Sequence, residues 1–154
     1  MLKIKKDVSA ALSLILAYVA LAVIGAIAAA IPFLNKFLYD YFFFGRLSIT
    51  VLFYLALIPV AVAAVLLIRL LGNVRRAEIF TASAVSRLRG ISWCCFAEFL
   101  ILVGGGICFY RISVFPHAFF VVAFVAAFLG IVLRVVKNVI EEAVAIKSEN
   151  DYTI

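Results

Sequence analysis

Residues 50–71 read TVLFYLALIPVAVAAVLLIRLL, an almost unbroken apolar run whose length decides the fold. A helix needs about 20 apolar residues to cross the hydrocarbon core of a bilayer. Three further runs reach this length, and the candidate spans are residues 8–31, 50–71, 91–110 and 118–136. The sequence therefore predicts an all-α integral membrane protein, a single domain built as a bundle of four transmembrane helices.

The composition also predicts a membrane protein. Apolar residues make up 68% of the 154 residues and charged residues 14%, whereas soluble domains average about 45–50% and about 25%. The start of the chain, MLKIKK followed by an apolar run and AIAAA, also resembles a signal peptide. The apolar run is longer than the about 7–15 residues of a signal core, so we expect a retained helix.

The distribution of Lys and Arg predicts which helix ends face the cytoplasm. Eleven of the 14 basic residues fall beside the ends expected on one side, and the other three are Lys36, Arg46 and Arg111. Both termini and the loop at residues 72–90 are therefore expected in the cytoplasm, the N-in/C-in topology of a multi-pass protein of the cell membrane. The same bias accounts for the net charge of +6, so no direct nucleic-acid partner is expected.

The connection at residues 32–49, PFLNKFLYDYFFFGRLSI, is rich in aromatic residues at helical spacing. Pro32 is expected to close the first helix, and the segment after it to lie in the headgroup plane as part of an aromatic belt. In an alternative interpretation it closes a pocket on the lipid side. Pro59, in the second span, is expected to kink that helix without preventing insertion.

Glu98, in WCCFAEFLILVGGG, is the only acidic residue set within a predicted span. A carboxyl group in the bilayer is costly, so it is expected to face the bundle interior and to be paired or protonated. Two interpretations stay open: a proton- or cation-binding site, or a neutral acid hydrogen-bonded to a neighbouring helix. The glycines at 104–106 predict close approach of another helix.

No motif typical of an enzyme or of a bound cofactor is present. Cys94 and Cys95 point to different faces of a helix and Cys108 lies roughly 21 Å along it, which excludes a shared metal site and leaves thiols expected to be buried. His117 has no second metal ligand nearby and is expected in a solvent-facing loop. With no nucleophile elbow, zinc signature or nucleotide loop, we expect neither catalysis nor a cofactor.

Two cytoplasmic stretches carry the remaining pattern. In IFTASAVSRLRGISW, Thr81 is placed to cap a helix that runs straight into the third span, and Arg87 and Arg89 are expected to meet the headgroups. The fourth helix is expected to leave the membrane near Arg134 and to continue to about residue 149, ahead of a tail at 150–154. Its acidic residues are expected to face the basic loop.

These stretches resemble a known family. Phe80-Thr81, Arg87-Leu88-Arg89 and Ile91 ahead of a span, and the tail Lys147, Glu149, Asn150, Asp151, Thr153 and Ile154, are similar to signatures of the small bacterial four-helix membrane proteins known as domain-of-unknown-function family 2975. Tyr152 stands where that family usually has Leu. The resemblance implies a gene beside a small helix-turn-helix regulator of the Cro/CI type, and it implies no ligand or catalytic residue.

The expected function follows from the tail and from this resemblance. We expect a membrane-embedded accessory or sensor protein that binds or tunes a cytoplasmic helix-turn-helix transcription regulator. The residues expected to bind this partner are Arg87, Arg89, Glu149, Asn150, Asp151, Tyr152, Thr153 and Ile154. In an alternative, the tail folds back on the basic loop and locks the bundle. Two other classes stay open: a small homo-oligomeric proton- or ion-coupled transporter using Glu98, and an immunity or membrane-integrity protein.

Overall fold

The computed structural model describes residues 6–37, 46–75, 81–108, 110 and 116–151. Within these ranges the chain forms four helices: α1 (Lys6–Phe37), α2 (Arg46–Arg75), α3 (Ala82–Cys108) and α4 (Pro116–Asp151). Each contains a segment that is long and apolar enough to cross a membrane. The prediction of an all-α protein with four candidate spans is confirmed.

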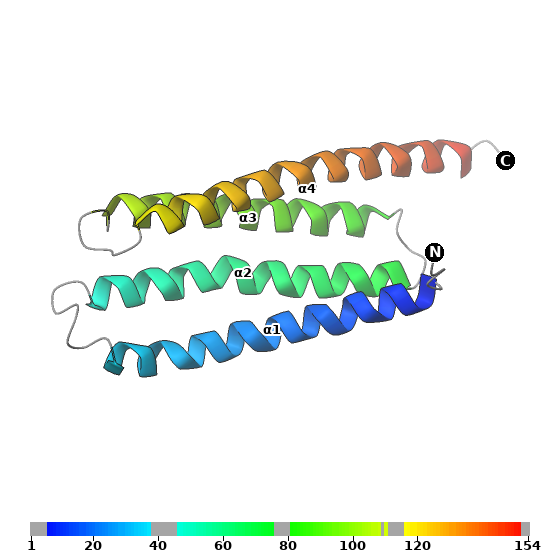
Figure 1. Ribbon diagram of the computed structural model, residues 1–154. Coiled ribbons are helices and arrows are strands. Elements are labelled where there is room, and N and C mark those ends of the chain that lie inside the picture. Colours follow the sequence, from blue (N-terminus) through cyan, green and yellow to red (C-terminus); the bar gives the residue numbers. More distant parts are fainter. Residues whose placement is uncertain (1–5, 38–45, 76–80, 109, 111–115, 152–154) are drawn as a thin grey trace, which may run out of the picture.

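The helices lie side by side in sequence order, as an open row (Figure 1). Each packs against the next along the chain, and the contact between α3 and α4 is the most extensive. Every other pair of helices makes at most slight contact across the described residues. Neighbouring helices run antiparallel, so the helix ends gather on two opposite sides of the molecule (Figure 1). One side, which we call the α2–α3 side, holds the start of α1, the end of α2, the start of α3 and the end of α4.

Helix α3 supplies most of the buried residues, because it lies between α2 and α4. Its buried positions are Ala84, Val85, Leu88, Ile91, Ser92, Leu102, Gly105 and Gly106. Large apolar side chains on the outward faces are exposed instead, such as Leu16 at 71% and Phe124 at 70%. An apolar surface this large is typical of a protein that contacts lipid.

The glycines at 104–106 differ in what they do. A Cβ on Gly105 would clash with the Leu52 side chain of α2, and one on Gly106 would lie 3.1 Å from the Phe120 ring of α4. A Cβ on Gly104 would meet nothing within 4 Å. The predicted close packing is therefore made by two of the three glycines, one toward each neighbour of α3.

The expectation that Pro32 closes the first helix is wrong, because α1 continues through it to Phe37. A proline inside a helix leaves the carbonyl four residues earlier without its N–H donor. Here that carbonyl belongs to Ala28, and it accepts a hydrogen bond of 3.2 Å from the Tyr54 hydroxyl of α2. A neighbouring helix thus supplies the missing donor, as membrane proteins commonly arrange around prolines.

Other differences concern segment ends. Helix α2 extends to Arg75, four residues past the predicted span, whereas α3 starts at Ala82, as the predicted Thr81 cap implies. His117 lies in the first turn of α4 rather than in a loop, since Pro116 is well suited to the first position of a helix. Cys108 is exposed, not buried, because it ends α3. Residues 38–45 of the expected aromatic belt lie outside the described residues.

Candidate functional site

Thr81 caps the start of α3, as predicted. Its hydroxyl oxygen lies 3.4 Å from the backbone N of Ala84, and its carbonyl accepts a 3.0 Å hydrogen bond from the same N–H. Asn73, near the end of α2, donates a 3.1 Å hydrogen bond to the Ser83 hydroxyl. The start of α3 is therefore fixed both by its own cap and by the end of α2.

Arg87 and Arg89, which were expected to act together, contact different helices. Arg87 donates a 2.7 Å hydrogen bond to the backbone carbonyl of Arg69 in α2. Arg89 pairs with Glu141 of α4 across 3.4 Å. Residues i and i+2 of a helix are about 200° apart around its axis, so the guanidinium groups of Arg87 and Arg89 point in different directions. Arg87 is thus engaged in joining α2 to α3, and Arg89 is the one that faces α4.

Glu141 accepts from two cations. Besides Arg89 of α3, Lys137 one turn earlier in α4 pairs with its carboxylate. The hydrogen bond from Lys137, followed by the charges of Lys137 and Arg89, holds the pKa of Glu141 below its ordinary value. Since the side chains of Arg89 and Glu141 are 56% and 49% exposed, solvent screens this pair, and its contribution to stability is small.

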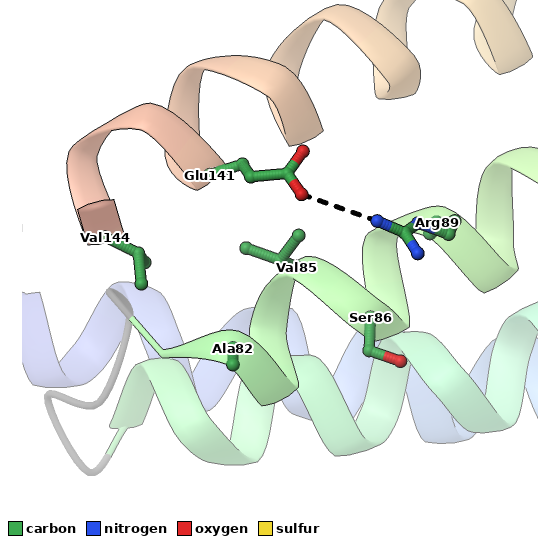
Figure 2. Close-up of a pocket in the computed structure, with 6 residues that line it drawn as sticks. All are labelled: Ala82, Val85, Ser86, Arg89, Glu141 and Val144. Carbon is green, nitrogen blue, oxygen red and sulfur yellow. Dashed lines mark hydrogen bonds and ion pairs between the residues drawn. The ribbon is translucent and has the colours of Figure 1, made fainter.

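A cavity of about 230 Å³ lies beneath this ion pair (Figure 2). It lies between the first two turns of α3 and the facing part of α4. Its lining includes apolar side chains, with the ion pair at its rim. The lining residues are Ala82, Val85, Ser86, Arg89, Glu141 and Val144. The cavity is partly open to the surface and lies at the start of α3.

Helix α4 projects past this cavity. Val144 and Ala82, the first residue of α3, both line the cavity, and α4 continues from Val144 to Asp151, which adds about two turns or roughly 10 Å. We call residues 145–151 the α4 projection; they form the last turns of α4, whose end reaches farther than the ends of the other helices in Figure 1. Ile146 is 56% exposed on it, and Lys147, Ser148 and Glu149 are exposed as well.

The other residues expected to bind a partner are described only in part. Asn150 and Asp151 belong to the last turn of α4, and nothing is described of their side chains. Tyr152, Thr153 and Ile154 lie outside the described residues. The structure thus brings Arg89 near the base of the projection, and it places Arg87 on the side facing α2.

Glu98 lies in the middle of α3 and is half-buried. Its Oε2 atom is buried and has no hydrogen-bond partner within the described part of the chain. Two apolar cavities meet at this residue, one of about 230 Å³ and one of about 210 Å³. We name them the Ala56 cavity and the Ala63 cavity after an α2 residue that lines each.

Sequence reasoning missed two polar contacts between α3 and α4. The Ser92 hydroxyl donates a buried 2.9 Å hydrogen bond to the Gly130 carbonyl. The Arg134 guanidinium lies 5.3 Å from the centre of the Trp93 ring and 5.4 Å from that of Phe96. Arg134 and Trp93 both suit a membrane interface, and that shared preference is the signal from which the pair was predictable.

Four antiparallel helices with apolar outward faces define the chain as a multi-pass helical membrane protein. Residues 17–154 match the family described as "Protein of unknown function (DUF2975)", and the chain belongs to this family. Comparison with curated proteins and with solved structures gave no match.

Proposed function

We propose that this protein is an accessory or sensor protein of the bacterial cytoplasmic membrane, which holds or tunes a soluble helix-turn-helix regulator of the Cro/CI type. The orientation in this proposal has both termini and the α2–α3 connection in the cytoplasm. This orientation is supported by the excess of Lys and Arg on the side of the molecule that holds the start of α1, the end of α4 and the α2–α3 connection. In that orientation the α4 projection extends into the cytoplasm.

The observation that carries the proposal is the projection itself. Ile146 is a large apolar side chain, 56% exposed and followed by exposed polar residues at 147–149. It lies beyond the start of α3 and, in the proposed orientation, past the membrane exit expected near Arg134, where lipid contact would not account for an apolar surface. An amphipathic helix end of this kind is a common anchor for a partner's groove. The cavity between α3 and α4, with Arg89 and Glu141 at its rim, continues the same surface.

The test compares two matched substitutions. Ile146→Ser and Val135→Ser each remove an apolar side chain from α4, with similar exposures of 56% and 57%. Val135 lies within the predicted span and Ile146 lies on the projection. Co-purification of the regulator encoded beside the gene is expected to fall about tenfold for I146S. It should be unchanged for V135S, and deletion of residues 148–154 should release the regulator from membranes in fractionation.

Equal recovery of the regulator with I146S and V135S would reject the projection as its binding surface. If neither I146S nor the deletion changes the partition of the regulator, the proposed function itself is wrong.

A second candidate is a homo-oligomeric proton- or ion-coupled transporter. The observation favouring it is that Oε2 of Glu98 has no partner within the described ranges and lies between two cavities that follow one another along α2 and α3. In proteoliposomes this candidate predicts a proton flux that Glu98→Gln abolishes. Equal flux for the wild type and E98Q would remove it.

A further inference from the structure

The half-buried acid in α3 is the starting point, because its Oε2 lacks a partner among the described residues. Buried polar atoms nearly always have a hydrogen-bond partner, and an exception calls for an explanation. Within the described part of the chain, no hydroxyl or carbonyl of a neighbouring helix pairs with this atom. A ligand that brings its own donor would satisfy it.

The surroundings of Glu98 restrict the chemistry of such a ligand. All four helices contribute to the Ala56 cavity, and apart from Glu98 its lining is wholly apolar; it includes Ile27, Leu52, Ala56, Leu102 and Phe119. The Ala63 cavity adds only thiols as further polar groups, from Cys94 and Cys95. Glu98 is therefore the single carboxyl group in either lining, and no basic group opposes it there.

A metal ion does not fit this lining. Calcium takes about 6–8 oxygen ligands, and magnesium takes a full octahedron. Among the described residues, no group of three His, Cys, Asp or Glu side chains is placed to hold a metal ion. An ammonium group needs one counter-charge and carries its own N–H donors. The apolar lining then suits a hydrophobic substituent on that nitrogen.

The size of the cavity sets the size of the substituent. An engineered apolar cavity of about 150 Å³ in another protein holds a benzene ring. The Ala56 cavity, at about 230 Å³, therefore has room for one ring and a short arm that reaches Glu98. The cavity is partly open, and Ile27 and Phe53 of its lining are exposed on the outer surface of the helices, so an uncharged amine dissolved in the bilayer would have a route into it.

We propose that Glu98 and the Ala56 cavity form a binding site for a small lipophilic amine, with the nitrogen at the carboxyl group and the apolar group against Ala56, Leu102 and Phe119. The neutral amine enters from the bilayer and takes the proton of the Glu98 carboxyl group. The O–H bond breaks, an N–H bond forms, and the two charges arise side by side. No other reactant is needed. This inference concerns binding and does not rest on the proposed function.

The test titrates benzylamine into the full-length protein in lipid nanodiscs, with glutamate labelled with ¹³C at the side-chain carboxyl carbon. The Glu98 resonance is assigned by its absence from Glu98→Gln. Benzylamine is expected to move it from the position of a neutral acid to that of a carboxylate. Benzyl alcohol, which has the same ring and no amine, should leave it in place.

Matched substitutions then locate the ring. Ala56→Phe fills the Ala56 cavity and Ala63→Phe fills the Ala63 cavity, and both are alanine to phenylalanine changes in α2. A56F is expected to weaken benzylamine binding about tenfold or more, and A63F to leave it unchanged. Should A56F fail to fold, as judged by its thermal transition, Ala56→Leu replaces it.

Three results would overturn the inference: a Glu98 resonance unmoved by benzylamine, binding of equal strength to E98Q, or a loss of binding with A63F and not with A56F. The same measurements remain decisive whether or not a regulator binds the α4 projection, because neither the probe nor the readout involves that surface.

Discussion

Gly130 lets α4 approach α3 more closely than any larger residue would. A Cβ there would lie 3.2 Å from Cys95 Cβ and 3.4 Å from the Phe96 ring. The Gly130 carbonyl also accepts the buried hydrogen bond from Ser92. The contact is therefore both tight and directional, and neither helix can shift along it without losing one of these features.

This contact predicts that Gly130→Val destabilises the protein more than Gly104→Val does. Both changes place the same side chain in a helix, but a Cβ on Gly104 would meet nothing within 4 Å. Overpacking a tight contact typically costs about 1–3 kcal/mol, and the two variants should differ by that amount. Thermal or denaturant unfolding in one detergent measures the difference, and equal stabilities would contradict the packing described.

At the residue scale, features that depend on local chemistry were predictable from the sequence, and features that depend on contacts with other helices were not. The Thr81 cap follows from residue type and position, and it is present. The continuation of α1 through Pro32 depends on a hydroxyl donated by Tyr54 in another helix. The divergence of Arg87 and Arg89 similarly depends on where α2 and α4 lie. No periodicity in one segment contains that information.

Polar contacts follow one side of the α3–α4 pair, from Ser92 with Gly130, through Arg134 above Trp93, to Arg89 with Glu141. The first is buried and the last is solvent-exposed. We therefore expect the α3–α4 contact to be firmer at Ser92 than at the ion pair of Arg89 and Glu141. The ion pair is the member of this series that lies nearer the α4 projection.

The depressed pKa of Glu141 predicts how this ion pair responds to pH. A carboxyl group whose pKa is lower in the folded state stabilises the fold above its ordinary pKa, about 4.3, and loses that contribution as the pH falls through the folded value. The protection factors of amides at residues 138–149, which compare exchange with the intrinsic rate at each pH, should therefore fall at acidic pH. Glu141→Gln should show the lower protection already at neutral pH, with a smaller dependence on acid.

A pH dependence of protection that is identical in the wild type and E141Q would show that other groups control this part of α4. Protection near Ser92 and Gly130 serves as the internal control, since the hydrogen bond there involves no titrating group.

Whole helices were easier to predict than their ends. The four spans follow from apolar length alone, and the structure has a helix over each of them. Their ends depend on capping and on the neighbouring helix, so that α2 runs on to Arg75 and α4 begins at Pro116. The cavity beside Glu98 was not predictable, because residues from four helices line it.

The open row of helices has a physical cause that composition does not reveal. Between helices in lipid there is little hydrophobic driving force, and close approach at small residues decides which pairs form. Small residues mark both sides of α3: Gly105 meets Leu52 of α2, and Ala123 of α4 is 1% exposed. Helix α1 contacts α2 but has no comparable contact with α4 among the described residues.

The topology is the claim on which the cytoplasmic projection and its proposed partner both depend. In a variant with Ser at all three native cysteine positions, single cysteines replace Ser83, His117 or Ser148, each exposed at a helix end. Spheroplasts are treated with a membrane-impermeant maleimide before and after lysis. We predict that H117C reacts in intact spheroplasts, whereas S83C and S148C react only after lysis. Reaction of S83C or S148C before lysis would contradict the account.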